Sequence, residues 1–216
     1  MVIAIDGPAG AGKSTVARAL AERLGFAYLD TGAMYRCVGL LALQAPAAEP
    51  AMLARESQIA FNYSPSGSPQ GAAPQVLLNG RDVTGEIRAA EVAEAASRVA
   101  EDGEVRAALV ARQRALVAQG DWVAEGRDIA SAVAPEAELK VYLTADPAER
   151  ARRRAEELGG EQGRILAEQA LRDQRDSTLG RSALAPAPGA VAVDSTGLAI
   201  EQVVQQIVEL AARQPA

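Results

Sequence analysis

The chain of 216 residues contains no histidine, one cysteine and two lysines. Without histidine there is no Ser-His-Asp or Cys-His nucleophile system, no histidine general base and no histidine-ligated zinc. Cys37 alone cannot form an internal disulfide, which is typical of a reducing compartment. No uncharged apolar run approaches about 18 residues, so no membrane-spanning segment is predicted. The first residues read as a strand instead of a secretory signal, and we expect a cytoplasmic protein.

The charge balance is acidic, with 22 Lys and Arg against 28 Asp and Glu and a net charge of −6. Binding to nucleic acid generally requires a basic excess, so the composition argues against a nucleic-acid partner. Arginine supplies 20 of the 22 basic residues. Against that background the lysine at position 13, inside a glycine-rich segment, is informative.

Short apolar runs alternate with helical periodicity, which predicts one domain of the α/β class with a mostly parallel sheet. The strands of that sheet are expected at Val2–Ile5, Ala27–Leu29, Trp122–Ala124, Leu139–Leu143 and Ala190–Asp194. Helices are expected at about Lys13–Leu24, Ala33–Gln44, Glu86–Ala100, Glu104–Ala118, Pro147–Leu158, Arg164–Asp176 and Ile200–Ala212.

The composition changes between the second and third of these helices, where Pro46 and Pro50 are expected to break the chain. The apolar runs Ile59–Tyr63 and Val76–Leu78 follow, and the Asn79-Gly80 dipeptide then predicts a hairpin turn into a third short strand. The sequence therefore predicts a small antiparallel insertion of about three strands.

The segment that carries the chemistry matches the pattern G-x-x-x-x-G-K-[ST] and comprises Gly7, Pro8, Ala9, Gly10, Ala11, Gly12, Lys13, Ser14 and Thr15. The glycines permit backbone torsions that other residues resist. Successive amide groups then form a nest for phosphate, backed by the positive end of the helix that follows. Lys13 adds a full charge for the β- and γ-phosphates of ATP, and the Ser14 hydroxyl is a candidate ligand for Mg²⁺. A strand before the segment and a helix after it complete the setting of a P-loop.

The identity of the acceptor is open at this point. A GTPase is disfavoured because the Asn-Lys-x-Asp motif is absent. A nucleoside monophosphate offers an oxygen that is already largely ionised at neutral pH, so a protein without histidine needs no base to use it. A metabolite hydroxyl would instead require a carboxylate base, for which Asp30 and Asp128 are candidates. A regulatory nucleotide-binding module without turnover is the third reading.

Four segments together resemble the bacterial cytidylate kinase family of P-loop nucleoside monophosphate kinases, and the likeness runs nearly end to end. They are Ile5–Pro8, Asp30–Arg36, Gly126–Ile129 and Arg172–Thr178. The resemblance implies a five-stranded parallel sheet flanked by helices, an arginine-rich lid, and transfer of the ATP γ-phosphate to CMP or dCMP. It divides a single domain into a core of residues 1–35 and 120–216, a monophosphate-binding insertion of about 36–119 and a lid of about 147–163. We expect a monomer.

The resemblance also assigns the acceptor site. Thr31 and Arg36 would face the acceptor nucleotide, with Arg36 and Arg127 on its phosphate. Arg172 and Asp176 would hold the ribose. Cytosine would be read by Ser97, Arg106 and Asp128. That set suits the base, because a carboxylate accepts from the exocyclic amine and a donor satisfies the ring acceptors.

The lid of the family corresponds to the arginine-rich stretch at 150–154. Arg153 is our choice for the residue that acts on the transferring phosphoryl group, with Lys13, Arg127 and Arg181 as the other catalytic candidates. The alternative is a solvated helix face, because Glu149–Arg153, Arg152–Glu156 and Arg153–Glu157 are spaced to pair with one another. Asp6 and Glu125 end strands at the ligand-binding edge and either hold water around Mg²⁺ or cap a loop.

The sequence departs from the family pattern after Asp176. An arginine usually follows three positions later, where this chain has Leu179, and the next arginine is Arg181. Either the acceptor phosphate has lost one arginine, or Leu179-Gly180 is a local insertion that returns Arg181 to the same place. We favour the insertion because Gly180 tolerates the torsions of a tight bulge.

Overall fold

The computed structural model of the protein describes residues 1–62, 74–158, 160–178 and 185–214. The chain forms two compact units. Unit 1 comprises Met1–Leu29 with Gln119–Ala216, and unit 2 comprises Asp30–Ala118. Each unit has its own core, and each is described by itself below.

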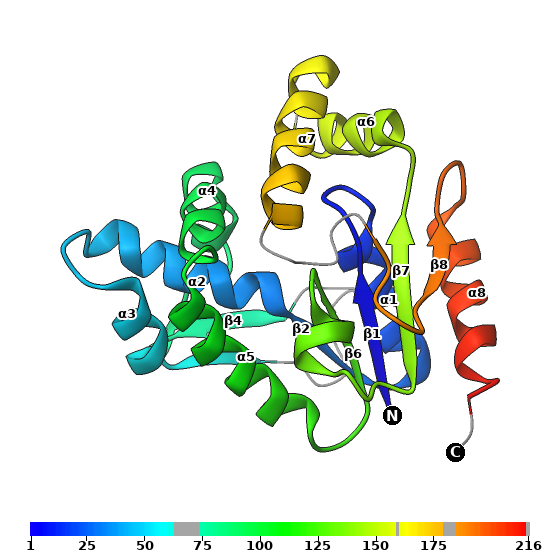
Figure 1. Cartoon of the computed structure of the whole chain (residues 1–216), viewed down its shortest axis with the longest axis horizontal. Helices are drawn as coiled ribbons and strands as arrows, with labels where there is room; N and C mark the ends of the chain where they lie inside the picture. The colour runs from blue at the N-terminus through cyan, green and yellow to red at the C-terminus, as the bar shows by residue number, and fades with distance from the viewer. Residues whose placement is uncertain (63–73, 159, 179–184, 215–216) are drawn as a thin grey trace. The chain divides into compact units, whose positions relative to one another are not determined.

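Unit 1 is built on a five-stranded parallel sheet in the order β2-β6-β1-β7-β8 (Figure 1). Its strands are β1 (Val2–Asp6), β2 (Ala27–Asp30), β6 (Trp122–Gly126), β7 (Leu139–Thr144) and β8 (Val191–Asp194). The central strand β1 pairs in parallel with β6 and β7, which places Ile5 opposite both Glu125 and Val141. The predicted α/β class and its parallel sheet are confirmed.

Helices α1 (Lys13–Leu24) and α8 (Ile200–Ala211) share one apolar core with this sheet. Leu20 of α1, Val141 of β7 and Ile207 of α8 are completely buried in it. Burial of such side chains contributes about 1.5–3 kcal/mol each, so this core fixes where β1 ends and α1 begins. Two further helices, α6 (Pro147–Leu158) and α7 (Gln162–Thr178), pack against each other.

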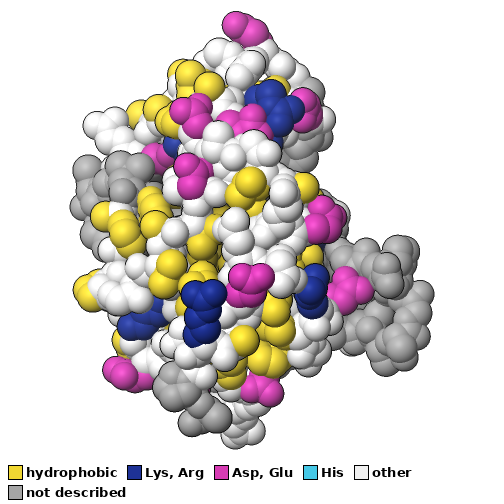
Figure 2. Space-filling model, turned by 90° about the vertical axis from the view of Figure 1, so that its right-hand side faces the viewer, with side chains coloured by type: hydrophobic (Ala, Val, Ile, Leu, Met, Phe, Trp, Pro, Cys, Tyr) yellow, Lys and Arg dark blue, Asp and Glu magenta, His cyan; other side chains and the backbone are white. Residues whose placement is uncertain are grey.

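The surface on the side of α8 mixes side chains of all kinds, as Figure 2 shows. The Lys and Arg side chains visible there lie apart from one another, among acidic and apolar ones.

In the residues that the structure describes, unit 2 combines four α-helices and one short 3-10 helix with a three-stranded antiparallel sheet in the order β3-β4-β5. The elements are α2 (Thr31–Gln44), α3 (Pro50–Glu56), β3 (Ile59–Asn62), β4 (Gln75–Leu78), β5 (Arg81–Asp82), the short helix η1 (Glu86–Arg88), α4 (Ala90–Val99) and α5 (Gly103–Val117). The sheet confirms the predicted insertion. A Cβ on Gly39 of α2 would lie 2.6 Å from the backbone nitrogen of Ala96, so glycine is what lets α2 approach α4. Cys37 is fully buried in the same core.

Two local predictions were wrong. Pro50 does not break the chain but begins α3, because proline at the first helical position removes no hydrogen bond that the helix needs. The helix predicted over Glu86–Ala100 is interrupted at Ala89, whose backbone is extended between η1 and α4. The interruption buries Ile87 in the core of unit 2 while α4 presents Val92 to the same core.

Candidate active site: a phosphate loop with its supporting side chains

The loop between β1 and α1 begins at a position that only glycine can occupy. Gly7 has φ +152°, and a Cβ built on it would lie 2.0 Å from the carbonyl oxygen of Leu143 in β7. That oxygen belongs to the backbone of a central strand and cannot move aside. The close approach therefore fixes the direction in which the chain leaves β1 at the carboxyl end of the sheet.

The loop ends at an open helix N-terminus. Gly12 is the N-cap of α1, and no side chain caps this helix in the described part of the chain. The first amides of a helix have no partner within the helix, so those of Lys13, Ser14 and Thr15 suit an anion. The Lys13 ammonium donates to the carbonyl oxygen of Pro8 at 2.7 Å and thus lies over the loop. The arrangement is that of a nest for phosphate with a fixed cation beside it.

Ser14 is held by a carboxylate at the edge of the sheet. Its hydroxyl donates to Glu125 Oε1 at 2.6 Å, and the Tyr28 hydroxyl donates to the same oxygen at 3.0 Å. Glu125 is buried, so these bonds set its orientation. A hydroxyl and a carboxylate are oxygen ligands of the kind that Mg²⁺ accepts together with phosphate and water. The pair fits a magnesium ion delivered with a nucleotide.

Asp6 has a different task from Glu125. Its carboxylate accepts from the backbone amides of Ile129 at 2.8 Å and Ala130 at 2.9 Å. These amides begin the π-helical turn η2 (Ile129–Val133). Of the two alternatives predicted for Asp6, the structure supports the loop cap. Burial raises the pKa of Asp6 to about 6, while the two backbone amides act in the opposite direction.

The arginines of α6 separate into different environments. Arg153 donates from Nη1 to Ser195 Oγ at 3.0 Å and from Nη2 to the Ser195 carbonyl at 2.6 Å. Its Nη1 atom lies 3.8 Å from where a Cβ on Gly12 would stand, so its guanidinium is close to the phosphate loop. Arg152 instead pairs with Glu149 and Glu156 on the exposed face. Both predicted environments, a charge near the loop and a solvated face, therefore occur on this one helix.

Arg150 was predicted only as one of the lid arginines, and its contacts with the phosphate loop were missed. It is buried, and its Nη1 atom donates to the carbonyl oxygen of Ala9 at 2.8 Å and to Asp173 Oδ2 at 2.7 Å. Asp173 was missed as well, although it stands between Arg172 and Asp176 in the segment that carries the family likeness. The only signal was its place in that segment, because helical spacing cannot reveal a pair 23 residues apart.

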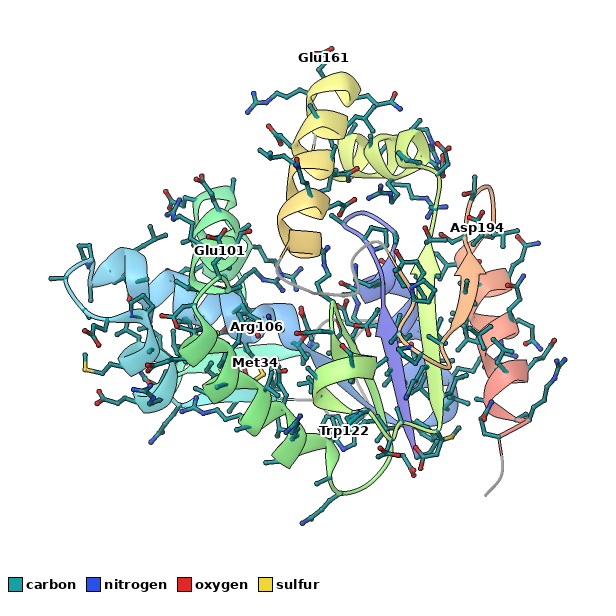
Figure 3. The ribbon with its side chains drawn as sticks, in the orientation of Figure 1. Met34, Glu101, Arg106, Trp122, Glu161 and Asp194 are labelled. Carbon is teal, nitrogen blue, oxygen red and sulfur yellow. The ribbon has the colours of Figure 1, made fainter. Side chains whose placement is uncertain are left out.

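Unit 2 holds Thr31, Arg36, Ser97 and Arg106, four of the predicted acceptor residues (Figure 3, with Arg106 labelled). An ion pair fixes the position of the Arg36 side chain, because its Nη2 atom lies 2.7 Å from Asp30 Oδ2. The other oxygen of Asp30 accepts from the Ala33 amide and caps α2, which is why this helix begins two residues before the predicted start. Thr31 is buried at the same helix start, while Ser97 and Arg106 are half-buried on α4 and α5.

Arg127 and Asp128 follow β6 in unit 1. The Arg127 guanidinium lies 3.7 Å from Asp173 Oδ1. Asp128 is buried and precedes η2, and its carbonyl oxygen accepts from the Ala132 amide within that turn. Arg172 and Asp176 lie on α7, where their side chains fall outside the description. Arg181 and the Leu179-Gly180 segment lie outside the described residues, so both explanations of that departure stay open.

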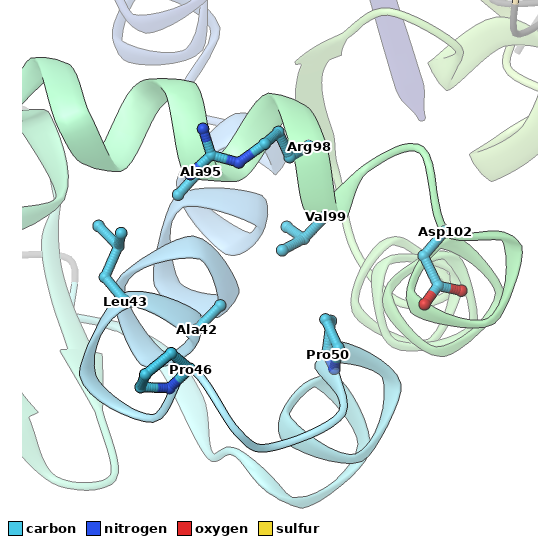
Figure 4. Close-up of a pocket in the computed structure, with 8 residues that line it drawn as sticks. All are labelled: Ala42, Leu43, Pro46, Pro50, Ala95, Arg98, Val99 and Asp102. Atoms are coloured by element: carbon cyan, nitrogen blue, oxygen red, sulfur yellow. The ribbon is translucent and has the colours of Figure 1, made fainter.

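A hollow of about 380 Å³ opens in unit 2 between the end of α2, the start of α3 and the end of α4 (Figure 4). Leu43, Pro46, Pro50 and Val99 give it a mainly apolar lining, with Arg98 and Asp102 as its charged residues. None of the predicted site residues lines it. The predicted site residues lie instead at other places, among them the phosphate loop and the start of α2.

Within the described residues, no three or more carboxylate or cysteine side chains gather as metal ligands. In the same part of the chain, no helix has both the length and the apolar character needed to cross a membrane.

The family model for cytidylate kinase matches residues 3–213. The chain belongs to the cytidylate kinase family. It is 45% identical to the cytidylate kinase of Solibacter usitatus, over 97% of this chain and 91% of that protein. It is 48% identical to the bifunctional pantoate ligase/cytidylate kinase of Prochlorococcus marinus, over 97% of this chain but 44% of that protein. The shikimate kinase of Bacteroides thetaiotaomicron shares the fold, with a TM-score of 0.51 and 14% identity over 98% of both chains.

The buried Asp6 carboxyl gives this cytidylate kinase family member a measurable pH signature. A raised pKa means that the folded protein keeps a proton that the unfolded chain releases between about pH 4 and pH 6. The contribution of Asp6 to stability is therefore complete below about pH 4 and is lost as the pH rises through about 6. Over this range the free energy of unfolding falls by about 3 kcal/mol on account of Asp6. We expect carbon-detected NMR to place the Asp6 titration near pH 6.

Asp82 provides the control. Hydrogen bonds from Thr84 and Gln75 lower the pKa of this exposed carboxyl to about 2, so it is expected to stay ionised throughout the same titration. An Asp6 titration at or below pH 4 would show that the carboxyl is not desolvated as described.

Proposed function

We propose that the protein transfers the γ-phosphoryl group of ATP to CMP or dCMP, giving ADP and the corresponding diphosphate. The observation that carries the proposal is the phosphate loop, with the Lys13 ammonium over Pro8 and the Ser14 hydroxyl against Glu125, in a chain that belongs to the cytidylate kinase family. All the residues invoked belong to one chain, so a monomer suffices. The buried thiol of Cys37 is compatible with a cytoplasmic setting.

The reaction needs positioning and charge neutralisation more than acid–base chemistry. The second pKa of a phosphate monoester is near 6, so the attacking oxygen of CMP is already largely ionised at neutral pH. A protein with no histidine is therefore not at a disadvantage. Fixed cations directed at the transferring group stabilise the charge that develops there.

On the donor side, the amides of residues 10–15 and the Lys13 ammonium would bind the β- and γ-phosphates of ATP. Ser14 and Glu125 would hold Mg²⁺, which supplies charge neutralisation between those phosphates when it is bound. Arg153 would approach the γ-phosphoryl group from α6. Its present bonds to Glu149 and Ser195 keep its guanidinium beside Gly12.

On the acceptor side, the phosphate of CMP would be bound by Arg36 and Arg127, with Thr31 beside the nucleotide and Arg181 as the further cation. The ion pair with Asp30 places the Arg36 guanidinium over Gly32, so this cation needs little rearrangement. Ser97, Arg106 and Asp128 would read cytosine. Arg172 and Asp176 would bind the ribose.

Replacement of Lys13 by Ala tests the donor site. We expect kcat for CMP phosphorylation to fall by about two to three orders of magnitude, as for the loss of one preorganised charge that stabilises the transition state. Helix α1 should form as before, and circular dichroism checks this. Lys140→Ala is the matched control, because this second lysine lies opposite Ala4, toward the amino end of β7, and should keep kcat within about twofold of the parent.

The same assay, run on the parent with CMP, dCMP, UMP, AMP and a hydroxyl acceptor such as shikimate, examines the acceptor class. A faster reaction with the hydroxyl acceptor than with any monophosphate would replace the proposal by a metabolite kinase. An unchanged kcat in folded Lys13→Ala would remove the donor site from the loop.

Asp128→Ala tests the recognition of the base. If the Asp128 carboxylate accepts from the exocyclic amine of cytosine, kcat/KM should fall more for CMP than for UMP, which has a carbonyl at that position. The expected loss of discrimination is about 1–3 kcal/mol, or roughly 5- to 150-fold. Equal losses with both nucleotides would make Asp128 a structural residue of the η2 turn.

A further inference from the structure

Asp173 of α7 is a buried carboxylate at which three parts of unit 1 meet. Its Oδ1 atom accepts from the Ala9 amide at 3.2 Å, and its Oδ2 atom accepts from Arg150 at 2.7 Å. Arg127 Nη1 lies 3.7 Å from Oδ1. A buried carboxylate is costly unless charged or polar partners surround it, and here the phosphate loop, α6 and the residue after β6 supply those partners.

The contacts around Ala9 form a closed ring. Arg150 donates to Asp173 and also, from the same nitrogen, to the carbonyl oxygen of Ala9 at 2.8 Å. Both polar backbone groups of Ala9 are therefore bound by the protein itself. The Ala9 amide points to Asp173 and is not a donor to nucleotide, so the phosphate donors of the loop must come from the residues that follow.

The next loop residue is packed against the same two helices. A Cβ on Gly10 would lie 2.5 Å from Gln169 Nε2 and 3.2 Å from Arg150 Cβ. Gln169 in turn donates to the carbonyl oxygen of Arg150 at 3.3 Å. The first half of the loop is thus set in place by α6 and α7, while its second half leads into the open N-terminus of α1.

We propose that Asp173 is a positioning residue for phosphoryl transfer. Its carboxylate orients the donor-phosphate loop through the Ala9 amide. The same carboxylate holds the guanidinium groups of Arg150 and Arg127 in fixed positions beside that loop. Because in-line transfer depends on the placement of donor and acceptor to within about 1 Å, loosening this carboxylate should slow the reaction without removing any group that touches nucleotide. The inference rests on the proposed function for the role of Arg127 and on the loop contacts alone for the role of Ala9.

Asp173→Asn is the principal test, because the amide keeps an acceptor for Ala9 while the charge that faces Arg150 and Arg127 is lost. We expect kcat with CMP to fall about 10- to 100-fold and the Kd of ADP, measured by calorimetry without CMP, to rise several-fold. Glu168→Gln is the matched control on the same helix, since Glu168 is exposed and pairs with Arg164. It should leave both values within about twofold.

A double-mutant cycle that combines Asp173→Asn with Arg150→Gln distinguishes an effect on loop position from a general loss of stability. If Asp173 and Arg150 act through the same interaction, their effects on kcat are not additive. The double variant should then lose no more kcat than the more impaired of the two single variants. All rates are compared well below the melting temperature of each variant. Should Asp173→Asn not fold, Arg150→Lys, which keeps the charge and loses the forked geometry, should still lower kcat about tenfold.

A folded Asp173→Asn variant with the kcat and ADP affinity of the control would overturn the inference, as would losses of kcat that multiply in the double variant. If the folded substitute Arg150→Lys keeps parental kcat, the inference is likewise overturned. A parent protein that binds ADP but does not phosphorylate CMP would instead overturn the proposed function. In that event the ADP affinities of Asp173→Asn and of the control Glu168→Gln still decide whether Asp173 positions the loop.

Discussion

The contact between the backbone of residue 7 and the carbonyl oxygen of Leu143 is the constraint on which the site depends. It leaves no room for a side chain at Gly7, so the chain must leave β1 in one direction, over the end of the central strands. That direction carries the loop across the carboxyl edge of the sheet and into α1. Ligands bind at this edge in open α/β sheets because loops from several strands converge there.

Several arginines near the predicted site residues are each held in place by an ion pair with a carboxylate. Asp30 orients Arg36, Glu149 orients Arg153, and Asp173 orients Arg150. An arginine fixed by a carboxylate has already lost much of its rotamer freedom, so little is left to lose when a phosphate binds. We propose that in this way a protein with a net charge of −6 offers Arg36 and Arg153 to phosphate groups of its substrates. The net charge describes the surface as a whole, whereas the site depends on local placement.

The strands, the phosphate loop and most helices of this protein were predictable from the sequence, because each depends on short-range pattern. The run before Asp6, the glycines of the loop and the charge at Lys13 lie within a dozen residues of one another. The supporting contacts were not predictable in this way. Tyr28 reaches Glu125 across 97 positions and Ala9 reaches Asp173 across 164, and no local periodicity encodes such pairs. The interruption at Ala89 likewise follows from the tertiary core rather than from helix propensity.

We propose that the donor and acceptor phosphates bind to different groups, the donor to the loop amides of unit 1 and the acceptor to the Arg36 cation at the start of α2. NMR of the labelled protein, titrated separately with Mg²⁺·ADP and with CMP, measures this most directly. The account predicts that Mg²⁺·ADP shifts the amide signals of Gly12, Lys13 and Ser14 first, and that CMP shifts those of Gly32 and Arg36. If CMP alone shifted the loop amides and left Gly32 and Arg36 unchanged, the assignment of the two nucleotides would be contradicted.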